Sequence, residues 1–164
     1  MNIAVLASGN GTNFEAIVRS VEEGKLKNAN IKILIGDRKD AFVYKRAKRY
    51  GVKTLFINSK SFKNRVLFDK EAVKILRKEK IELVVLAGFM RILSPHFVKA
   101  FKNRILNIHP ALLPSFKGDS AIKEAHKYGV KITGVTVHLV DNEVDHGPII
   151  LQEALKVKER ESLE

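Results

Sequence analysis

The chain has 164 residues, and 30 Lys and Arg outnumber 18 Asp and Glu, so its formal net charge is +12 at pH 7. Hydrophobic residues make up 45% of the sequence, enough for the core of one globular domain, and the absence of cysteine excludes disulfides, thiolate metal sites and a cysteine nucleophile. No basic, apolar leader begins the chain and no apolar run approaches the roughly 18 residues that span a bilayer. We therefore expect a soluble, cytoplasmic protein.

Strand-like and helix-like patterns alternate along the chain. The first half of the chain predicts a strand 2–7, a glycine turn 8–13 followed by a helix with apolar residues at 14, 17, 18 and 21, a strand 31–36, and a helix from about 41 that stops at Gly51. A strand 54–57, a helix with its apolar face at 68, 72, 75 and 76, and a strand 83–87 follow. The rest of the chain predicts a short helix begun by Ser94 and Pro95, a strand 104–109, a helix capped by Asp119 or Ser120 that runs to Tyr128, and strands 132–139 and 149–154.

This alternation predicts an α/β fold with a single doubly wound, mostly parallel sheet and helices on both faces. Strands that are apolar on both faces are typical of such a sheet. With no repeat, linker or low-complexity tract, residues 1–164 are expected to form a single domain. Ligands of these sheets bind beyond the carboxyl ends of the strands.

The first candidate site is the glycine turn, Gly9, Asn10, Gly11, Thr12 and Asn13. Free N–H groups and the dipole at the start of the next helix favour an anion such as phosphate. Phe14 stands where a dinucleotide fingerprint has its third glycine, and no Gly-Lys-Ser/Thr follows, so a monophosphate is favoured. The alternative is a tight turn capped by Thr12 or Asn13.

The second candidate site lies on the strand that Pro110 ends. Because side chains alternate along a strand, Asn107 and His109 point to the same face. An amide can donate to a developing oxyanion, and a histidine can hold or transfer a proton near neutral pH. The alternative for His109 is a structural histidine within the core.

A third group follows in the next part of the chain. Thr136 and His138 share one face of their strand, and Asp145 lies in a polar loop closed by Gly147 and Pro148. An Asp beside a His would serve as a base or stabilise an imidazolium, although an acidic loop is more often only solvated. His126 and His146 receive no role.

Metal, hydrolase and nucleic-acid functions find little support. The spacing of His109, His138 and Asp145 matches no compact ligand motif, so no metal is expected, and no G-x-S-x-G turn supports a serine hydrolase. The cations are dispersed on polar helix faces that we expect to be solvated, for example Lys45, Arg46, Lys48 and Arg49. Nucleic acid is therefore disfavoured despite the charge of +12.

Four segments in order resemble one family, the phosphoribosylglycinamide (glycinamide ribonucleotide) formyltransferases. They are 8–17 (SGNGTNFEAI), 86–93 (LAGFMRIL), 107–114 (NIHPALLP) with Phe116 and Gly118, and 134–138 (GVTVH) leading to 145–150 (DHGPII). Each segment alone is weakly specific, but together they cover nearly the whole chain.

The resemblance implies formyl transfer from 10-formyltetrahydrofolate to the amine of glycinamide ribonucleotide, with no metal and no covalent intermediate. It implies Asn107, His109 and Asp145 as catalytic residues, Pro110 and His138 as supporting residues, and Gly9 to Asn13 as the substrate-phosphate loop. The folate site falls on Met90, Arg91, Ile92, Leu93, Val98, Val140 and Asp141. The implied partners are these two small molecules, with a homo-oligomer left open.

The chain departs from this family in two places. Asp119 to Ile122 stands where some relatives have a His-rich stretch, and relatives continue for tens of residues past the position of Glu164, so we expect the C-terminal segment of those relatives to be lacking. Three alternatives stay open: a formyltetrahydrofolate hydrolase, a methionyl-tRNA formyltransferase, and an inactive folate- or nucleotide-binding module.

Overall fold

The computed structural model describes residues 1–158, and the chain divides into two units, Met1–Ile105 and Leu106–Glu164, which are described in turn. No helix among the described residues is both long enough and apolar enough to cross a bilayer.

Four parallel strands form the sheet of the first unit. β1 (Asn2–Ala7) pairs on one side with β2 (Asn30–Gly36) and on the other with β4 (Leu83–Leu86), and β2 also pairs with β3 (Thr54–Phe56). β1 is buried from Ile3 to Ala7, as expected for a strand that has neighbours on both sides and helices on both faces. The predicted strands of this unit are confirmed, with boundaries that differ by one residue at most.

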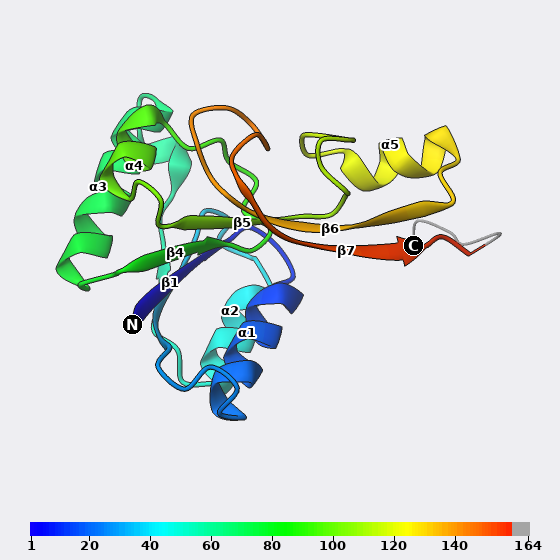
Figure 1. The fold of residues 1–164 in the computed structure, drawn as a ribbon. Coiled ribbons are helices and arrows are strands. Elements are labelled where there is room, and N and C mark those ends of the chain that lie inside the picture. Colours follow the sequence, from blue (N-terminus) through cyan, green and yellow to red (C-terminus); the bar gives the residue numbers. More distant parts are fainter. Residues whose placement is uncertain (159–164) are drawn as a thin grey trace. The chain divides into compact units, whose positions relative to one another are not determined.

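Helices cover both faces of this sheet (Figure 1). α1 (Thr12–Glu22) and α2 (Val43–Arg49) lie on one face, and α3 (Arg65–Lys78) and α4 (Pro95–Ala100) lie on the other. A short 3-10 helix, Ser59–Ser61, precedes α3 and was not predicted. The predicted α/β class, with helices on both faces of a parallel sheet, is confirmed.

The alternating direction of side chains along β1 explains why helices pack on both faces of the sheet. Ile3, Val5 and Ala7 pack in one buried cluster with Phe14 and Val18 of α1. The residues between them point to the opposite face, so one strand contributes to two apolar layers.

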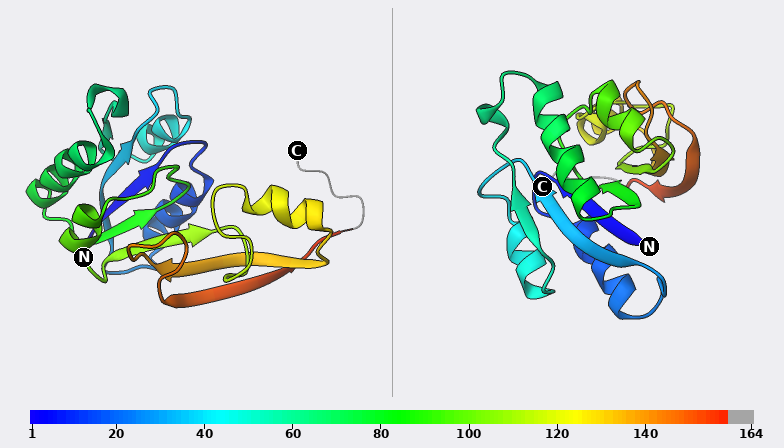
Figure 2. Two further views of the ribbon diagram at one scale, coloured as in Figure 1. Left: turned by 90° about the horizontal axis from the view of Figure 1, so that it is seen from above. Right: turned by 90° about the vertical axis from the view of Figure 1, so that its left-hand side faces the viewer.

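The second unit is built on an antiparallel ladder. β5 (Ile105–His109) pairs with β6 (Ile132–Leu139), which pairs with β7 (Ile149–Lys156). α5 (Ala121–Tyr128) buries Ala121 and Ala125, one helical turn apart. Figure 2 shows β6 and β7 running side by side over their length.

Helix starts differ from the predicted capping. Gly11 precedes α1 as its N-cap, so neither Thr12 nor Asn13 has that place. Ser94 and Ser120 occupy N-cap positions as predicted, but their hydroxyls make no capping bond. The N–H of Ser94 instead donates to buried Asp69 at 2.6 Å, which ties the start of α4 to α3.

Candidate functional site

The ladder of the second unit brings the predicted catalytic residues together. Asn107 on β5 lies directly opposite His138 on β6, and Asp145 meets both. The Asn107 Nδ2 atom is 3.2 Å from Asp145 Oδ1 and 3.1 Å from His138 Nε2. His109 Nδ1 is 3.3 Å from Asp145 Oδ2. The predicted common face of Asn107 and His109 is therefore confirmed, since both reach the same carboxylate.

The loop after β6 places the Asp145 carboxylate. Asp145 has a φ of 48°, which is uncommon for a residue other than glycine, and its side chain is only 9% exposed. The loop also needs Gly147, because a Cβ there would lie 1.9 Å from the Leu139 carbonyl oxygen. The N–H of Gly118 donates to Asp145 Oδ2 at 2.8 Å, so a second segment fixes the carboxylate.

His109 lies between this carboxylate and a main-chain carbonyl. Its Nε2 atom is 2.7 Å from the Phe116 oxygen, and because a carbonyl only accepts, Nε2 carries a hydrogen. Nδ1 faces Asp145, so protonation there creates an imidazolium beside the carboxylate. The ring is 3% exposed. This geometry suits a histidine that holds a proton in a site rather than one packed among apolar groups.

His138 is held in a comparable way. Its Nδ1 atom lies 2.9 Å from its neighbour's carbonyl oxygen, that of Leu139, and its Nε2 atom lies 3.4 Å from Asp145 Oδ1. Burial lowers the pKa of His138, but the bonds with Asp145 and Leu139 and the charges of Asp145 and Asp141 outweigh it, so the pKa is raised above its ordinary value.

Opposing effects also act on the pKa of the Asp145 carboxyl. Burial raises the pKa of this carboxyl, whereas the bonds from His138 and the Gly118 N–H and the nearby imidazoles lower it, with a net decrease. Asp145 is therefore an anion at neutral pH. This anion lies beside both imidazoles and helps to raise the pKa of His138.

Thr136, which the sequence placed on one face with His138, and Gln152, which the sequence did not single out, hold the segment that follows β5. The hydroxyl of fully buried Thr136 donates to the Ala111 carbonyl at 2.7 Å and accepts from the Leu113 N–H at 3.0 Å. Gln152 of β7 donates to Thr136 at 3.0 Å and to the Leu113 carbonyl at 2.9 Å. These bonds fix the chain that follows exposed Pro110.

No group of three or more His, Asp or Glu within residues 1–158 is arranged to hold a metal ion. His109, His138 and Asp145 do converge. However, His109 contacts Oδ2 of the carboxylate at 3.3 Å and His138 contacts Oδ1 at 3.4 Å, which are distances of direct polar contact between the side chains. His146 pairs with Asp141 at 2.8 Å on the surface, outside this group.

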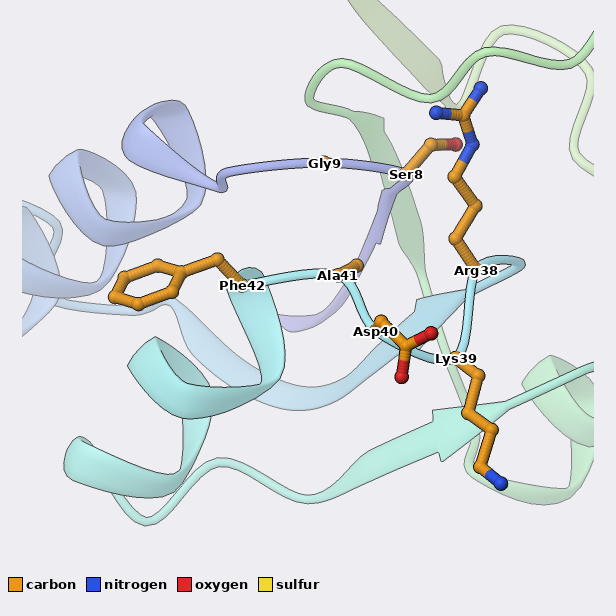
Figure 3. A pocket seen from close by; sticks show the side chains of 7 residues that line it. All are labelled: Ser8, Gly9, Arg38, Lys39, Asp40, Ala41 and Phe42. Carbon is orange, nitrogen blue, oxygen red and sulfur yellow. The ribbon is translucent and has the colours of Figure 1, made fainter.

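The predicted phosphate loop belongs to the first unit, where it borders a cleft of about 390 Å³. The cleft is lined by Ser8, Gly9, Arg38, Lys39, Asp40, Ala41 and Phe42. Figure 3 shows the Arg38 side chain extending toward Ser8, whereas the side chains of Lys39 and Phe42 point away from Ser8. Exposed Gly9 and Asn10 thus follow the carboxyl end of β1, and Arg38 and Lys39, which follow β2, line the same cleft.

Residues of helix α2 donate hydrogen bonds to oxygen atoms of this loop. The Val43 N–H donates to the Gly9 carbonyl at 3.1 Å, and Arg46 donates from Nε to the Asn10 carbonyl at 2.9 Å and from Nη2 to Asn10 Oδ1 at 3.1 Å. Arg46 also pairs with Glu15 of α1. Its side chain is only 17% exposed, so Arg46 differs from the expected solvated basic face.

The predicted folate residues of the first unit follow β4. Met90 and Ile92 expose their apolar side chains, whereas Leu93 and Val98 are buried. Arg91 lies over the Phe68 ring, 4.6 Å from its centroid.

Ser8 joins the start of the phosphate loop to this segment. Its hydroxyl accepts from the Met90 N–H at 2.9 Å, and its own N–H donates to the Gly88 carbonyl at 3.0 Å. The remaining two predicted folate residues, Val140 and Asp141, begin the loop after β6 in the second unit, and both are half-buried.

The sequence matches the family described as Formyl transferase over residues 1–164. It is 41% identical to a phosphoribosylglycinamide formyltransferase of Bacillus subtilis, over 98% of this chain and 82% of that protein. It is also 47% identical to the human trifunctional purine biosynthetic protein adenosine-3, over 95% of this chain but 15% of that longer protein.

Solved structures agree with the sequence comparison. A phosphoribosylglycinamide formyltransferase of Bacillus halodurans superposes with a TM-score of 0.95 at 41% identity, covering 99% of this chain and 84% of that one. A glycinamide ribonucleotide transformylase of Symbiobacterium toebii gives a TM-score of 0.94 at 44% identity, covering 97% and 74%. The likeness extends over both units of the chain.

Proposed function

The chain belongs to the formyl transferase family, and from this premise we propose that it transfers the formyl group of 10-formyltetrahydrofolate to the amine of glycinamide ribonucleotide. The observation that carries the proposal is the convergence of Asn107 and His109 on the carboxylate of Asp145, which is only 9% exposed. Similarity to phosphoribosylglycinamide formyltransferases over 98% of the chain supports this choice of substrates.

The reaction moves one carbon without oxidation or reduction. The amine lone pair attacks the formyl carbon, and the carbonyl electrons move onto its oxygen. When the bond between that carbon and the folate N10 breaks, the carbonyl re-forms. The amine loses one proton and N10 gains one, so the products are the N-formylated ribonucleotide and tetrahydrofolate.

Each proposed catalytic residue acts on one of these changes. An N–H of Asn107 donates to the formyl oxygen, and the positive charge of a protonated His109 stabilises the negative charge that forms on that oxygen. Asp145, an anion at neutral pH, balances the charge of the His109 imidazolium during the reaction and accepts the amine proton directly or through water.

Binding and orientation are assigned to the first unit. The proposed phosphate loop leads into the first turn of α1, where the N–H groups of a helix have no partner within the helix, while Arg46 and Val43 bond to the loop's oxygens. Exposed Met90 and Ile92 offer an apolar surface for the folate ring. Fixing both reactants in this way removes much of the entropic barrier to a bimolecular reaction.

The proposed partners are two small molecules rather than a nucleic acid or a membrane, and the proposed location is the cytoplasm. Both reactants are anionic, which suits a net charge of +12. Whether like chains assemble is a separate question that sedimentation would answer.

The test is an acceptor comparison with the purified chain and 10-formyltetrahydrofolate. Tetrahydrofolate is followed by absorbance and the formylated acceptor by mass spectrometry, with glycinamide ribonucleotide, methionyl-tRNA or water as the acceptor. We expect one tetrahydrofolate per formylated ribonucleotide and little product with the other two. Equal release without an acceptor would indicate a hydrolase, and release only with the charged tRNA would indicate the other transferase.

A further inference from the structure

Asn107 has two amide hydrogens, and both are used inside the site. Nδ2 lies 3.2 Å from Asp145 Oδ1 and 3.1 Å from His138 Nε2, both of which can accept a hydrogen bond. An amide nitrogen has no third hydrogen. In this arrangement Asn107 therefore cannot also donate to a formyl oxygen, as the proposed function requires.

The protonation state of His138 decides whether one hydrogen is released. Its Nδ1 atom faces the Leu139 carbonyl at 2.9 Å and so carries a hydrogen in either state. In the neutral ring, Nε2 is a lone-pair acceptor for Asn107. In the protonated ring, Nε2 carries a hydrogen, cannot accept from Asn107, and faces Asp145 Oδ1 at 3.4 Å.

We propose that His138 is a positioning residue whose protonated form releases one N–H of Asn107 toward the formyl oxygen, and whose neutral form keeps it within the site. This inference rests on the proposed function. His138 does not itself touch the reacting atoms, and its proton is not consumed in the reaction.

The surroundings of His138 favour the protonated form. From the loop after β6 it faces the carboxylates of Asp145 and Asp141, and from β5 it faces Asn107 and shares Asp145 with His109. β7 places apolar Ile149 opposite it in the register. The charges of these two carboxylates make a positive charge on His138 favourable, even though each carboxylate also has a second imidazole beside it, and the raised pKa of His138 agrees.

Because the hydrogen bond from Asn107 and the protonation of His138 are coupled, removing the bond should change the pKa of His138 in a known direction. If Asn107 bonds only to neutral His138, that bond lowers the pKa of His138, and its loss must raise it. Removal of this hydrogen bond should therefore raise the pKa of His138 measurably above that in the parent protein.

The experiment is a pH titration of the imidazole ¹⁵N resonances by NMR in the full chain and in Asn107→Ala. The His138 resonances are assigned by their loss in His138→Gln, and His146, which pairs with Asp141 on the surface, is the internal control. We expect the pKa of His138 to rise in Asn107→Ala, whereas the His146 resonances should not differ between the two proteins. An unchanged or lowered pKa of His138 would overturn the inference.

Kinetics supply a second test. In His138→Gln, we expect kcat for formyl transfer to fall roughly tenfold or more, as for loss of an oxyanion donor, with KM for glycinamide ribonucleotide within about twofold of the parent. Parallel changes in kcat and both KM values would indicate a merely structural role. If the parent does not formylate the ribonucleotide, the proposed function fails, whereas the NMR titration still tests the coupling of His138 to Asn107.

Discussion

Asp145 and His109 are joined by a 3.3 Å contact between Oδ2 and Nδ1, in which each side chain is less than a tenth exposed. The same carboxylate also meets Asn107, His138 and the Gly118 N–H. Since four groups from three segments depend on two oxygen atoms, the charge and direction of one side chain set the chemistry of the site.

Gly11→Val should weaken binding of glycinamide ribonucleotide more than binding of the folate. Gly11 has a φ of 79°, and a Cβ there would lie 2.3 Å from Val43 Cγ2, so the loop must move. We expect KM for the ribonucleotide to rise roughly tenfold, equivalent to about 1.4 kcal/mol, and KM for the folate to change little.

The matched control is Gly24→Val, which has a φ of 72° but nothing within 4 Å of the added carbon. It shares the backbone strain without the steric clash. Equal increases of both KM values in Gly11→Val would reduce the loop to a folding element.

Arg46→Met should also raise KM for the ribonucleotide. The substitution removes two hydrogen bonds to Asn10 and leaves half-buried Glu15 without its closest ion pair. We expect a roughly threefold to tenfold increase, measured by steady-state kinetics with saturating folate.

Arg49→Met is the control for Arg46→Met, because Arg49 lies on the same helix, contacts Glu15 at 3.4 Å and is 68% exposed. An unchanged KM in Arg46→Met, or the same increase in both variants, would show that Arg46 does not position the loop.

Thr136→Val should destabilise the protein. Valine keeps the shape of a strand residue but cannot replace the hydroxyl that bonds to Ala111, Leu113 and Gln152. Leaving such buried groups unpaired should lower the free energy of unfolding by about 1–3 kcal/mol in urea denaturation. Thr133→Val, half-buried on the same strand, should cost less, and equal losses would contradict the structure.

The raised pKa of His138 predicts a pH dependence of stability. A group with a raised pKa in the folded state contributes stability that is fully present below its unfolded pKa, near 6.5, and is lost as pH rises through the folded value. The difference in unfolding free energy between the parent and His138→Gln should therefore be larger near pH 5.5 than near pH 8.5. A constant or reversed difference would show that His138 is not stabilised in its charged form.

The sequence predicted the strands and the shared face of Asn107 and His109 because alternation along a strand is a local property. It could not predict the partners that come from main-chain atoms, namely the Phe116 carbonyl and the Gly118 N–H, since every residue carries these groups. Their roles follow only from the path of the loop after β5.

Arg46 shows a different limit of the sequence. In sequence it is one of several cations on a short helix, and nothing local separates it from exposed Arg49. Its contacts with Asn10 and Glu15 depend on how α2 packs beside α1, which is a tertiary property. The one sequence feature that bears on the role of Arg46 is Glu15, an acidic residue in the first turn of the helix after the glycine loop. It indicates that a cation can pair there, but not which cation does so.

The turnover of Asp145→Asn tests the account most directly. Asparagine keeps the size of the side chain but removes the negative charge beside His109 Nδ1 and His138 Nε2. With glycinamide ribonucleotide and 10-formyltetrahydrofolate, kcat should fall by roughly two or more powers of ten with little change in either KM. The control is Asp119→Asn, because Asp119 is an exposed carboxylate that accepts from the Ser120 hydroxyl, and this variant should stay near the parent. A near-parental kcat in Asp145→Asn would contradict the assignment of this carboxylate to formyl transfer.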